Sequence, residues 1–329
     1  MAEAGSSGLE ESRPQHSVKI DPRAYLLLVL MVLIGSSTAT AAKFAVRELP
    51  VGLLPLIRFG VAGLCVLPVV WRGGAIGRLV RESGGRLLLT SALCVPINQF
   101  FFLNATRLAP TSHVGLFYAS CPLVVLLLAA ALGQERLATG RLIGVLASVS
   151  GVVVIALGHY WGGGVAGRSA LLGDLLLVGA VLSWGSYLTV SKPLIARHGA
   201  LVVLTGTFLV GSALDVPIAL ATLPSWSPLG QVSRTAWVGL AYLTLIVTVF
   251  GLACQNQALR LLDASQVATF GNAAPVLTVV WGVWLLHEEV SPTLILGGVL
   301  TLGGIVWTMR PARRPVANVS PGVLDPTRR

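Results

Sequence analysis

Ten long apolar segments follow one another along the chain and constrain its fold more than any other feature. They span residues 24–45, 51–71, 87–106, 111–133, 142–158, 171–193, 201–221, 235–259, 264–286 and 293–309. Each segment is long enough, as a helix rising 1.5 Å per residue, to cross a hydrocarbon core of about 30 Å. A soluble protein could bury one such helix, but ten in series predict an all-α polytopic membrane protein with ten transmembrane helices.

Charged residues are scarce and unevenly placed. They make up 11% of the 329 residues, against about 25% in a soluble domain. With a cytoplasmic amino terminus, 17 of the 23 basic residues fall on the cytoplasmic side and only four in outer loops, as the positive-inside rule requires. We therefore expect a plasma membrane protein with both termini cytoplasmic. Its net charge of +10 then faces anionic lipid headgroups, and we expect no nucleic acid partner.

The second half of the sequence repeats the first with a shift of 153 residues. Pro122 and Glu135 match Pro275 and Glu288 at this shift. The same shift pairs further Arg, Ser, Phe and Gly residues: Arg107 with Arg260, Ser112 with Ser265, Phe117 with Phe270, Gly144 with Gly297 and Gly151 with Gly304. Matches of such varied residues at one fixed spacing indicate a duplicated unit.

Each repeat unit contains five helices. Because five is odd, the two units must face opposite ways across the bilayer, and such inverted repeats are typical of secondary transporters. The predicted units are residues 24–158 and 171–309, joined by a glycine-rich connector at 159–170. We expect a disordered cytoplasmic tail at 1–23 and a basic cytoplasmic tail at 310–329.

Three prolines interrupt predicted helices near the middle of the membrane: Pro96, Pro122 and Pro275. Proline has no N–H group and leaves the carbonyl four residues earlier without its helical partner. In lipid that carbonyl needs another donor or must line a water-filled cavity. A packing kink and a functional helix break are both open for these sites.

Uncharged polar and aromatic residues converge on the same depth, where they would form a solute-binding cavity with aromatic walls. The predicted substrate-binding residues are Ser36, Asn98, Tyr118, Trp184, Ser186 and Asn272. Hydrogen bonds between helices are the alternative role for several of them.

Two ionisable residues, Arg58 and Asp215, lie inside apolar segments at similar depths. Charges within a membrane are costly, so both are candidates for coupling or gating, alone or as a pair. The alternative is that Arg58 extends towards the interface and Asp215 is satisfied locally. Gln255, near the inner end of the eighth segment, is a further gating candidate. Glu135 and Glu288 are expected to cap the helices at 142–158 and 293–309.

Other features exclude function classes. The four cysteines lie in apolar segments without metal-ligand spacing, and no zinc, phosphate-binding or nucleophile-elbow motif occurs. We expect no metal, no cofactor and no enzymatic activity. The repeated glycines at 144, 151, 297 and 304 predict close packing of the fifth and tenth helices within the monomer, and a homodimer through the tenth helix remains open.

The sequence resembles the EamA-type ten-helix branch of the drug/metabolite transporter superfamily. The resemblance is carried by Gly35-Ser36-Ser37 with Lys43, Arg58-Phe59, "RLAPTSHVGLFYASCPL" at 107–123, Gly173-Asp174, and "ALRLLDASQVATFGNAAPV" at 258–276, with Glu135 and Glu288 after the two long motifs. It implies ten helices around a central cavity lined by the first, third, fourth, sixth, eighth and ninth. It also implies transport of amino acids, other metabolites or toxic compounds, often outward and often driven by a proton or ion gradient. The first helix lacks the membrane-embedded glutamate that couples protons in the short multidrug relatives.

These observations favour a secondary transporter that exports a small metabolite, amino acid-like solute or drug by alternating access around a central cavity. Coupling to a proton or another ion is a candidate driving force. The alternative within transporters is a lipid or glycolipid flippase. Outside that class, an integral membrane transferase and a non-transporting sensor are the alternatives.

Overall fold

The computed structural model describes residues 22–71, 73–131, 139–161, 165–222, 229–251, 253–255, 257 and 273–309. Within these ranges the chain is helical and contains no strand. Seven helical stretches are long and apolar enough to cross a membrane, and three shorter apolar helices accompany them. The protein is therefore an all-α, multi-pass membrane protein, whereas the total of ten transmembrane helices stays a prediction.

The first half comprises α1 (Pro22–Ser36), α2 (Thr38–Val46), α3 (Leu53–Trp71), α4 (Ala75–Ala92), the π-helix η1 (Leu93–Ile97), α5 (Asn98–Leu108), α6 (Thr111–Ala119), α7 (Cys121–Ala131) and α8 (Thr139–Trp161). The second half comprises α9 (Val165–His198), α10 (Ala200–Thr222), the 3-10 turn η3 (Leu229–Gln231), α11 (Arg234–Ala241), the π-helix η4 (Tyr242–Phe250), α14 (Ala274–Leu286) and α15 (Pro292–Met309).

Several predicted segments are not continuous α-helices. The first changes from α1 to α2 at Ser37, and the fourth changes from α6 to α7 at Ser120. The third and eighth each contain a π-helical stretch, η1 and η4. Breaks and π-bulges leave backbone groups outside the regular hydrogen-bond ladder, and such places are frequent at functional sites.

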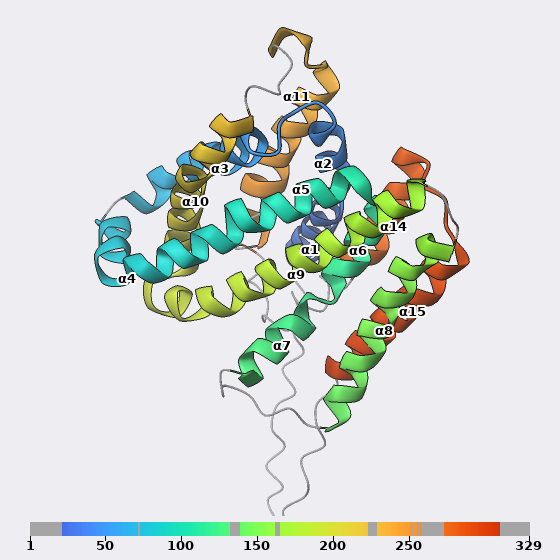
Figure 1. Cartoon of the computed structure of the whole chain (residues 1–329). Helices are drawn as coiled ribbons and strands as arrows, with labels where there is room; N and C mark the ends of the chain where they lie inside the picture. The colour runs from blue at the N-terminus through green and yellow to red at the C-terminus, as the bar shows by residue number, and fades with distance from the viewer. Residues whose placement is uncertain are drawn as a thin grey trace, which may run out of the picture.

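The two halves interleave instead of forming separate bundles. The most extensive helix contacts join α8 to α15, α3 to α10, α5 to α9, α4 to α10 and α6 to α14. Figure 1 shows α8 and α15 lying side by side. The core cluster between α2, α5, α6 and α9 includes Ala42, Leu103, Phe117 and Leu177.

Glycine contacts give the direction of these helix pairs. A Cβ added at Gly304 of α15 would lie 2.5 Å from the carbonyl oxygen of Gly144, and one at Gly151 of α8 would lie 2.5 Å from that of Gly297. Residue numbers therefore increase along α8 in the direction in which they decrease along α15, so the two helices are antiparallel. The contacts of Gly52 with Ala219 and of Gly63 with Leu209 show the same for α3 and α10.

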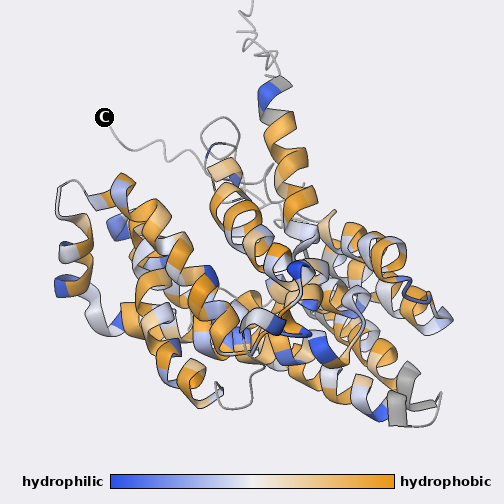
Figure 2. Ribbon diagram, turned by 90° about the horizontal axis from the view of Figure 1, so that it is seen from above, coloured by the Kyte–Doolittle hydropathy of each residue, from blue (hydrophilic) through white to orange (hydrophobic). Residues whose placement is uncertain are grey.

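The outer surface is apolar, as lipid contact demands. Figure 2 shows hydrophobic residues along the outward sides of the helices. Large apolar side chains are extensively exposed there, among them Leu64, Val69 and Trp284 at 59%, 70% and 67%. A water-soluble monomer rarely exposes so much contiguous apolar surface, so these faces are the lipid contact of the protein.

Two helix boundaries differ from the sequence-based expectation. The third helical stretch begins at Ala75, well before residue 87, and is kinked at Ser83, where φ is −142° and ψ is 24°. The arginines of this stretch therefore lie on α4, because the helix bends at Ser83 and then continues. The predicted connector is helical at residues 159–161 and 165–170, at its two ends, and residues 162–164 lie outside the described ranges.

Candidate functional site

Asn98, the first residue of α5, is the centre of a buried polar network. Its Nδ2 lies 2.8 Å from the carbonyl oxygen of Ala180 and 3.1 Å and 3.2 Å from the hydroxyls of Tyr118 and Ser183. Its Oδ1 accepts a hydrogen bond from Gln99 at 3.0 Å. We call Asn98, Tyr118 and Ser183 the Asn98 network. It ties α5, α6 and α9 together at the level where η1 interrupts the regular helix.

An aromatic wall adjoins this network. The Trp184 and Tyr187 rings on α9 are 4.9 Å apart, and Tyr118 meets Phe102 edge to face at 5.9 Å. Trp184 is half-buried and packs against both the main core cluster and the cluster around Phe59. Ser186 is also half-buried and forms no hydrogen bond with the described residues. Four of the predicted substrate-binding residues therefore lie on three helices: Asn98 on α5, Tyr118 on α6, and Trp184 and Ser186 on α9.

Ser36 has a different environment. Its hydroxyl accepts a hydrogen bond from the Trp281 indole at 2.9 Å, and its carbonyl accepts one from Thr278 at 3.0 Å. Both partners lie on α14, and the Ser36 side chain is buried. These bonds attach the end of α1 to α14. The sixth predicted residue, Asn272, lies outside the described residues.

The three prolines occupy helix junctions. Pro96 lies in η1. Pro122 is the second residue of α7, and Pro275 is the second residue of α14. A proline in the first helical turn loses no hydrogen bond, because the N–H groups there have no intrahelical acceptor. Both α7 and α14 therefore start as new helices just before a proline, 153 residues apart.

Arg58 and Asp215 do not form the suggested pair. Arg58 donates from Nε to Thr248 on η4 at 2.9 Å, and among the described residues no ion pair or hydrogen bond joins it to Asp215. Asp215 is buried on α10, and its Oδ2 has no hydrogen-bond partner. Gln255 is exposed near the far end of the eighth segment.

Glu288 clamps the start of α6. Its Oε1 accepts hydrogen bonds from the Thr111 amide at 2.6 Å and the Thr111 hydroxyl at 2.8 Å, and its Oε2 accepts one from the Ser112 amide at 3.0 Å. The ammonium of Lys43 on α2 lies 3.4 Å from Oε1 and donates to the Ala109 carbonyl at 3.0 Å. We call these contacts the Glu288 clamp, and the membrane face that holds them the Glu288 face.

The prediction that Glu288 caps the tenth helix is therefore wrong. That helix, α15, is capped by the Ser291 hydroxyl, which accepts a hydrogen bond from the Leu294 amide at 3.1 Å. His287 takes a left-handed conformation with φ 53°, ends α14, and turns Glu288 back over α6. Gly282 leaves room for the carboxylate, because an added Cβ would lie 2.5 Å from its Oε2. Glu135 lies outside the described residues.

The clamp holds Glu288 in its charged form. Burial by itself raises the pKa of the Glu288 carboxyl. The Ser112 and Thr111 amides, the Thr111 hydroxyl and the Lys43 ammonium stabilise the carboxylate more strongly, so its pKa lies below the ordinary 4.5. The clamp is thus an ion pair and helix cap at neutral pH.

A second buried acid–base pair was missed by the sequence analysis. His113 Nδ1 lies 2.8 Å from Asp174 Oδ1, and both side chains are almost fully buried. The signal that could have found the pair is the Gly173-Asp174 motif, because Gly173 allows α9 to approach Ala109 closely.

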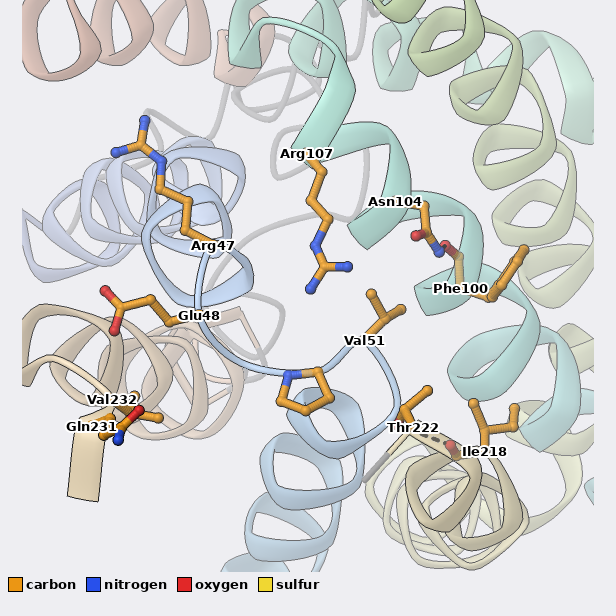
Figure 3. Close-up of a pocket in the computed structure, with 11 residues that line it drawn as sticks. Arg47, Glu48, Val51, Phe100, Asn104, Arg107, Ile218, Thr222, Gln231 and Val232 are labelled. Atoms are coloured by element: carbon orange, nitrogen blue, oxygen red, sulfur yellow. Dashed lines mark hydrogen bonds between the residues drawn. The ribbon is translucent and has the colours of Figure 1, made fainter. Parts of the chain in front are cut away.

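A pocket of about 540 Å³ opens on the Glu288 face. Figure 3 shows the Arg107 side chain pointing into it, with Glu48 and Arg47 on one side and Asn104 on another. Arg107 donates to the Val46 and Leu49 carbonyls at 2.9 Å and 3.0 Å and so caps the end of α2. None of the predicted substrate-binding residues that the structure describes lines this pocket.

The described residues contain no group of three or more His, Cys, Asp or Glu side chains that could hold a metal ion. The polar groups of the site are instead amides, hydroxyls, one buried guanidinium and the two acid–base pairs. Such groups can bind and orient a solute.

The comparisons with known proteins agree with this architecture. The sequence pattern of the EamA-like transporter family matches residues 22–157 and again 171–310. An uncharacterized transporter of Bacillus subtilis, YetK, is 25% identical over 304 residues and covers 91% of each chain. A solved crystal structure aligns with a TM-score of 0.59 over 89% of this chain and 99% of the other, at 24% identity, which shows a shared fold.

Two further relatives carry functional names. A protein of Streptantibioticus cattleyicolor named "Probable terminal-alkyne amino-acid exporter" is 30% identical over 293 residues, covering 88% of this chain and 94% of the relative. The "Aromatic amino acid exporter YddG" of Ancylobacter novellus is 27% identical over 216 residues, covering 66% of this chain and 73% of the relative. These relatives are transporters and not enzymes, which removes the transferase alternative. The chain belongs to the EamA-like transporter family of the drug/metabolite transporter type, as a membrane protein that moves a small solute.

Proposed function

We propose that this protein is a secondary transporter that exports a small amino acid-like solute across the plasma membrane by alternating access. The observation that carries the proposal is the antiparallel packing of equivalent helices. Helices α8 and α15 occupy the last place in the two family-matched halves, and α3 and α10 the second place, and each pair is antiparallel. This supports two inverted five-helix repeats, the arrangement that supplies a gate at each membrane face.

The solute would bind beside the Asn98 network. The Trp184 and Tyr187 rings offer an apolar wall, and the Tyr118 hydroxyl accepts from Asn98, which leaves its own proton free to donate. In this proposal Asn98, Tyr118, Trp184 and Ser186 contact the solute. Ser36 supports the site through α14, and Asn272 keeps its role from the sequence alone.

The Glu288 clamp would close one face. It joins the first helical segment, the start of α6 and the end of α14, which belong to different halves. Relative movement of the halves would separate these partners. The distribution of basic residues supports an outer position for this face and cytoplasmic termini.

The names of two relatives point to the solute class. One is named as an exporter of terminal-alkyne amino acids and one as an exporter of aromatic amino acids. An aromatic wall next to uncharged hydrogen-bonding groups is suited to a solute of this kind, with an apolar part and a polar part.

Transport assays with Trp184→Ala and Asn98→Ala test the site. Proteoliposomes containing the full chain are loaded with labelled amino acids, organic acids and amines, and efflux is compared with protein-free liposomes. Loss of the Trp184 ring should raise KM roughly 10- to 100-fold for a solute with an apolar side chain, because about 1.5–3 kcal/mol of apolar burial is lost. Asn98→Ala should also slow efflux, because Tyr118 loses its donor.

Leu182→Ala is the matched control, since Leu182 also lies on α9 but is 51% exposed on the lipid side. It should leave KM unchanged. If no solute leaves faster than from protein-free liposomes, the transport proposal is wrong. If solutes move and Trp184→Ala behaves like Leu182→Ala, the transporter stands and this binding site does not.

Asp215→Asn tests proton coupling. Asp215 is a buried acid within a membrane span with an unpartnered Oδ2, so it can exchange a proton during the transport cycle. We expect the variant to lose the stimulation of efflux by a pH gradient while keeping solute exchange at equal pH. If a pH gradient stimulates efflux equally in the wild type and in Asp215→Asn, then Asp215 has no part in the coupling mechanism.

A further inference from the structure

One buried cation, Arg58, has no anionic partner among the described residues. Its side chain on α3 is 7% exposed. Nε donates to the Thr248 hydroxyl oxygen at 2.9 Å, and the guanidinium carbon lies 5.0 Å from the centre of the Phe59 ring. Thr248 gives its own hydroxyl proton to the Leu243 carbonyl at 2.8 Å. Arg58 therefore contacts a neutral oxygen and a ring, and neither carries a compensating charge.

The acids of the described chain are engaged elsewhere or do not reach Arg58. The ion pairs join Lys43 to Glu288, His113 to Asp174 and Arg197 to Glu82. The titratable side chains that pack in one cluster with the neighbouring Phe59 are the Cys94 thiol and the Tyr187 phenol, which are neutral at pH 7. Burying a cation without a counter-charge is strongly unfavourable. A cation that is nevertheless buried within a membrane span indicates a function for its charge.

The free edge of the guanidinium faces accessible space. Nη1 and Nη2 make no hydrogen bond with any residue that the structure describes. Polar atoms that are sealed from solvent without a partner include Asp215 Oδ2 and Gln99 Oε1, but neither Nη atom of Arg58. Both Nη atoms therefore border a space that a water-sized molecule can enter, and four N–H donors point from these nitrogens.

The surroundings of this space match the proposed solute site. Arg58 on α3 reaches Thr248 on η4, and its neighbour Phe59 packs in one cluster with Cys94 of η1, so the guanidinium lies where α3, η1 and η4 meet. Trp184 packs against this cluster and also against the main core cluster, which Tyr118 contacts as well. Tyr118 belongs to the Asn98 network. The Trp184–Tyr187 wall packs against the cluster that contains Phe59 and Cys94. The positively charged guanidinium of Arg58 thus lies next to the uncharged Trp184–Tyr187 wall.

We propose that Arg58 binds the carboxylate of the transported solute through Nη1 and Nη2. This inference rests on the proposed transport function and narrows its solute to carboxylates with an apolar or aromatic body. The planar guanidinium fork matches the two oxygens of a carboxylate and forms charge-assisted bonds with both. The described residues around Arg58 offer no carboxylate for an ammonium group, so the carboxylate is the recognised charge.

Four probe compounds that share a phenyl ring distinguish recognition of the carboxylate from recognition of the ring and of the ammonium group. L-phenylalanine and 3-phenylpropionate carry the carboxylate, whereas L-phenylalaninamide and 2-phenylethylamine do not. Binding to the purified full-length protein is measured by the rise in melting temperature with probe concentration. We expect the two carboxylates to stabilise the protein and the other two to have no effect. Arg58→Gln should weaken carboxylate binding by roughly 10- to 100-fold, and Arg58→Lys by less.

A structural role for Arg58 gives a different result without any probe. Arg58→Gln removes an uncompensated buried charge, so the variant should melt at or above the wild-type temperature. Arg107→Gln is the matched control, because Arg107 caps α2 through two carbonyls. It should melt lower and keep the preference for carboxylates.

Three results would overturn the inference. These are equal stabilisation by phenylalanine and phenylalaninamide, undiminished stabilisation of Arg58→Gln by the carboxylates, and stabilisation of the wild type by none of the four probes. Flux measurements distinguish a failure of the carboxylate assignment from a failure of the proposed transport function. If Arg58→Gln proteoliposomes carry every solute at the wild-type rate, transport stands and the carboxylate assignment falls. If wild-type proteoliposomes carry no solute, the proposed function falls with it.

Discussion

Replacing Glu288 by alanine is expected to destabilise the protein and to open the Glu288 face. The Thr111 and Ser112 amides lose their acceptor, and the Lys43 ammonium loses its anion. A lost helix cap and a lost charge-assisted hydrogen bond together cost roughly 2–4 kcal/mol. Both effects fall on the contact between α2, α6 and the end of α14. The closed form of this face should lose stability relative to an open one.

Two measurements check this expectation. Thermal unfolding of the purified protein should show a lower melting temperature for Glu288→Ala. Opening is followed by maleimide labelling of Cys94, which is buried beside Arg58, in a protein whose other three cysteines are replaced by serine. Labelling should accelerate about tenfold or more, since 1.4 kcal/mol corresponds to a factor of ten.

The neighbouring acid supplies the control. Glu289 is exposed and forms no hydrogen bond with the described residues, so Glu289→Ala should change neither melting nor labelling. Equal effects of the two substitutions would show that the clamp does not hold the face closed.

The clamp also predicts a pH dependence with a definite sign. The pKa of the Glu288 carboxyl is lowered in the folded protein from its ordinary 4.5. A lowered pKa contributes stability that is complete above the unfolded value and is lost as the pH falls through the folded value. The difference in melting temperature between the wild type and Glu288→Gln should therefore be constant above about pH 5 and shrink on stronger acidification. A difference that shrinks on raising the pH from 5 to 8 would contradict this.

Replacing Gly304 by alanine is expected to separate α8 from α15. A Cβ at Gly304 would lie 2.5 Å from both the Gly144 carbonyl oxygen and the Ser148 amide nitrogen. These are backbone atoms and cannot rotate away, so the whole helix pair must shift. Overpacking of this kind typically costs 1–3 kcal/mol. Melting temperature and the fraction of monodisperse protein after detergent extraction should both fall.

Gly303 is the matched control one residue away. An added Cβ there would meet nothing within 4 Å. Alanine is also the better helix former by roughly 1 kcal/mol, so Gly303→Ala should be neutral or stabilising. If Gly304→Ala is as stable as Gly303→Ala, then α8 and α15 do not pack as closely as described. The same packing leaves the glycine side of α15 covered by α8 within one chain.

Features that depend on local sequence were predictable. Apolar length predicts helices that cross a membrane, because a span must satisfy its own backbone hydrogen bonds. The shared spacing of Pro122 and Pro275 predicts equivalent irregularities, and α7 and α14 indeed begin 153 residues apart. The repeated glycines predict a close approach of two helices, because only glycine lets two backbones come that near. The contacts of Gly151 and Gly304 confirm that approach.

Partners of polar side chains were not predictable in the same way. Glu288 was expected to cap the helix that follows it, yet it caps α6, 177 residues away in sequence. Ser36 was a predicted substrate-binding residue, and no sequence pattern indicated that its hydroxyl accepts a hydrogen bond from Trp281. His113 and Asp174 are 61 residues apart in sequence, yet their side chains lie 2.8 Å apart. In each case the partner comes from a helix that is adjacent only after the two halves interleave.

The sequence by itself determined that this chain is a duplicated, all-α membrane protein of a transporter family. The duplication and the membrane-spanning helices follow from repeat spacing and segment length, and the family follows from the motifs that the chain shares with it. All of these exist before any tertiary contact forms. Only the tertiary structure decided that Arg58 has no counter-charge among the described residues and that Lys43 meets Glu288 across 245 residues of sequence. The physical reason is that a side chain's direction depends on which face of its helix packs against a neighbour. Interleaving of two similar halves leaves several such neighbours equally compatible with the same apolar pattern.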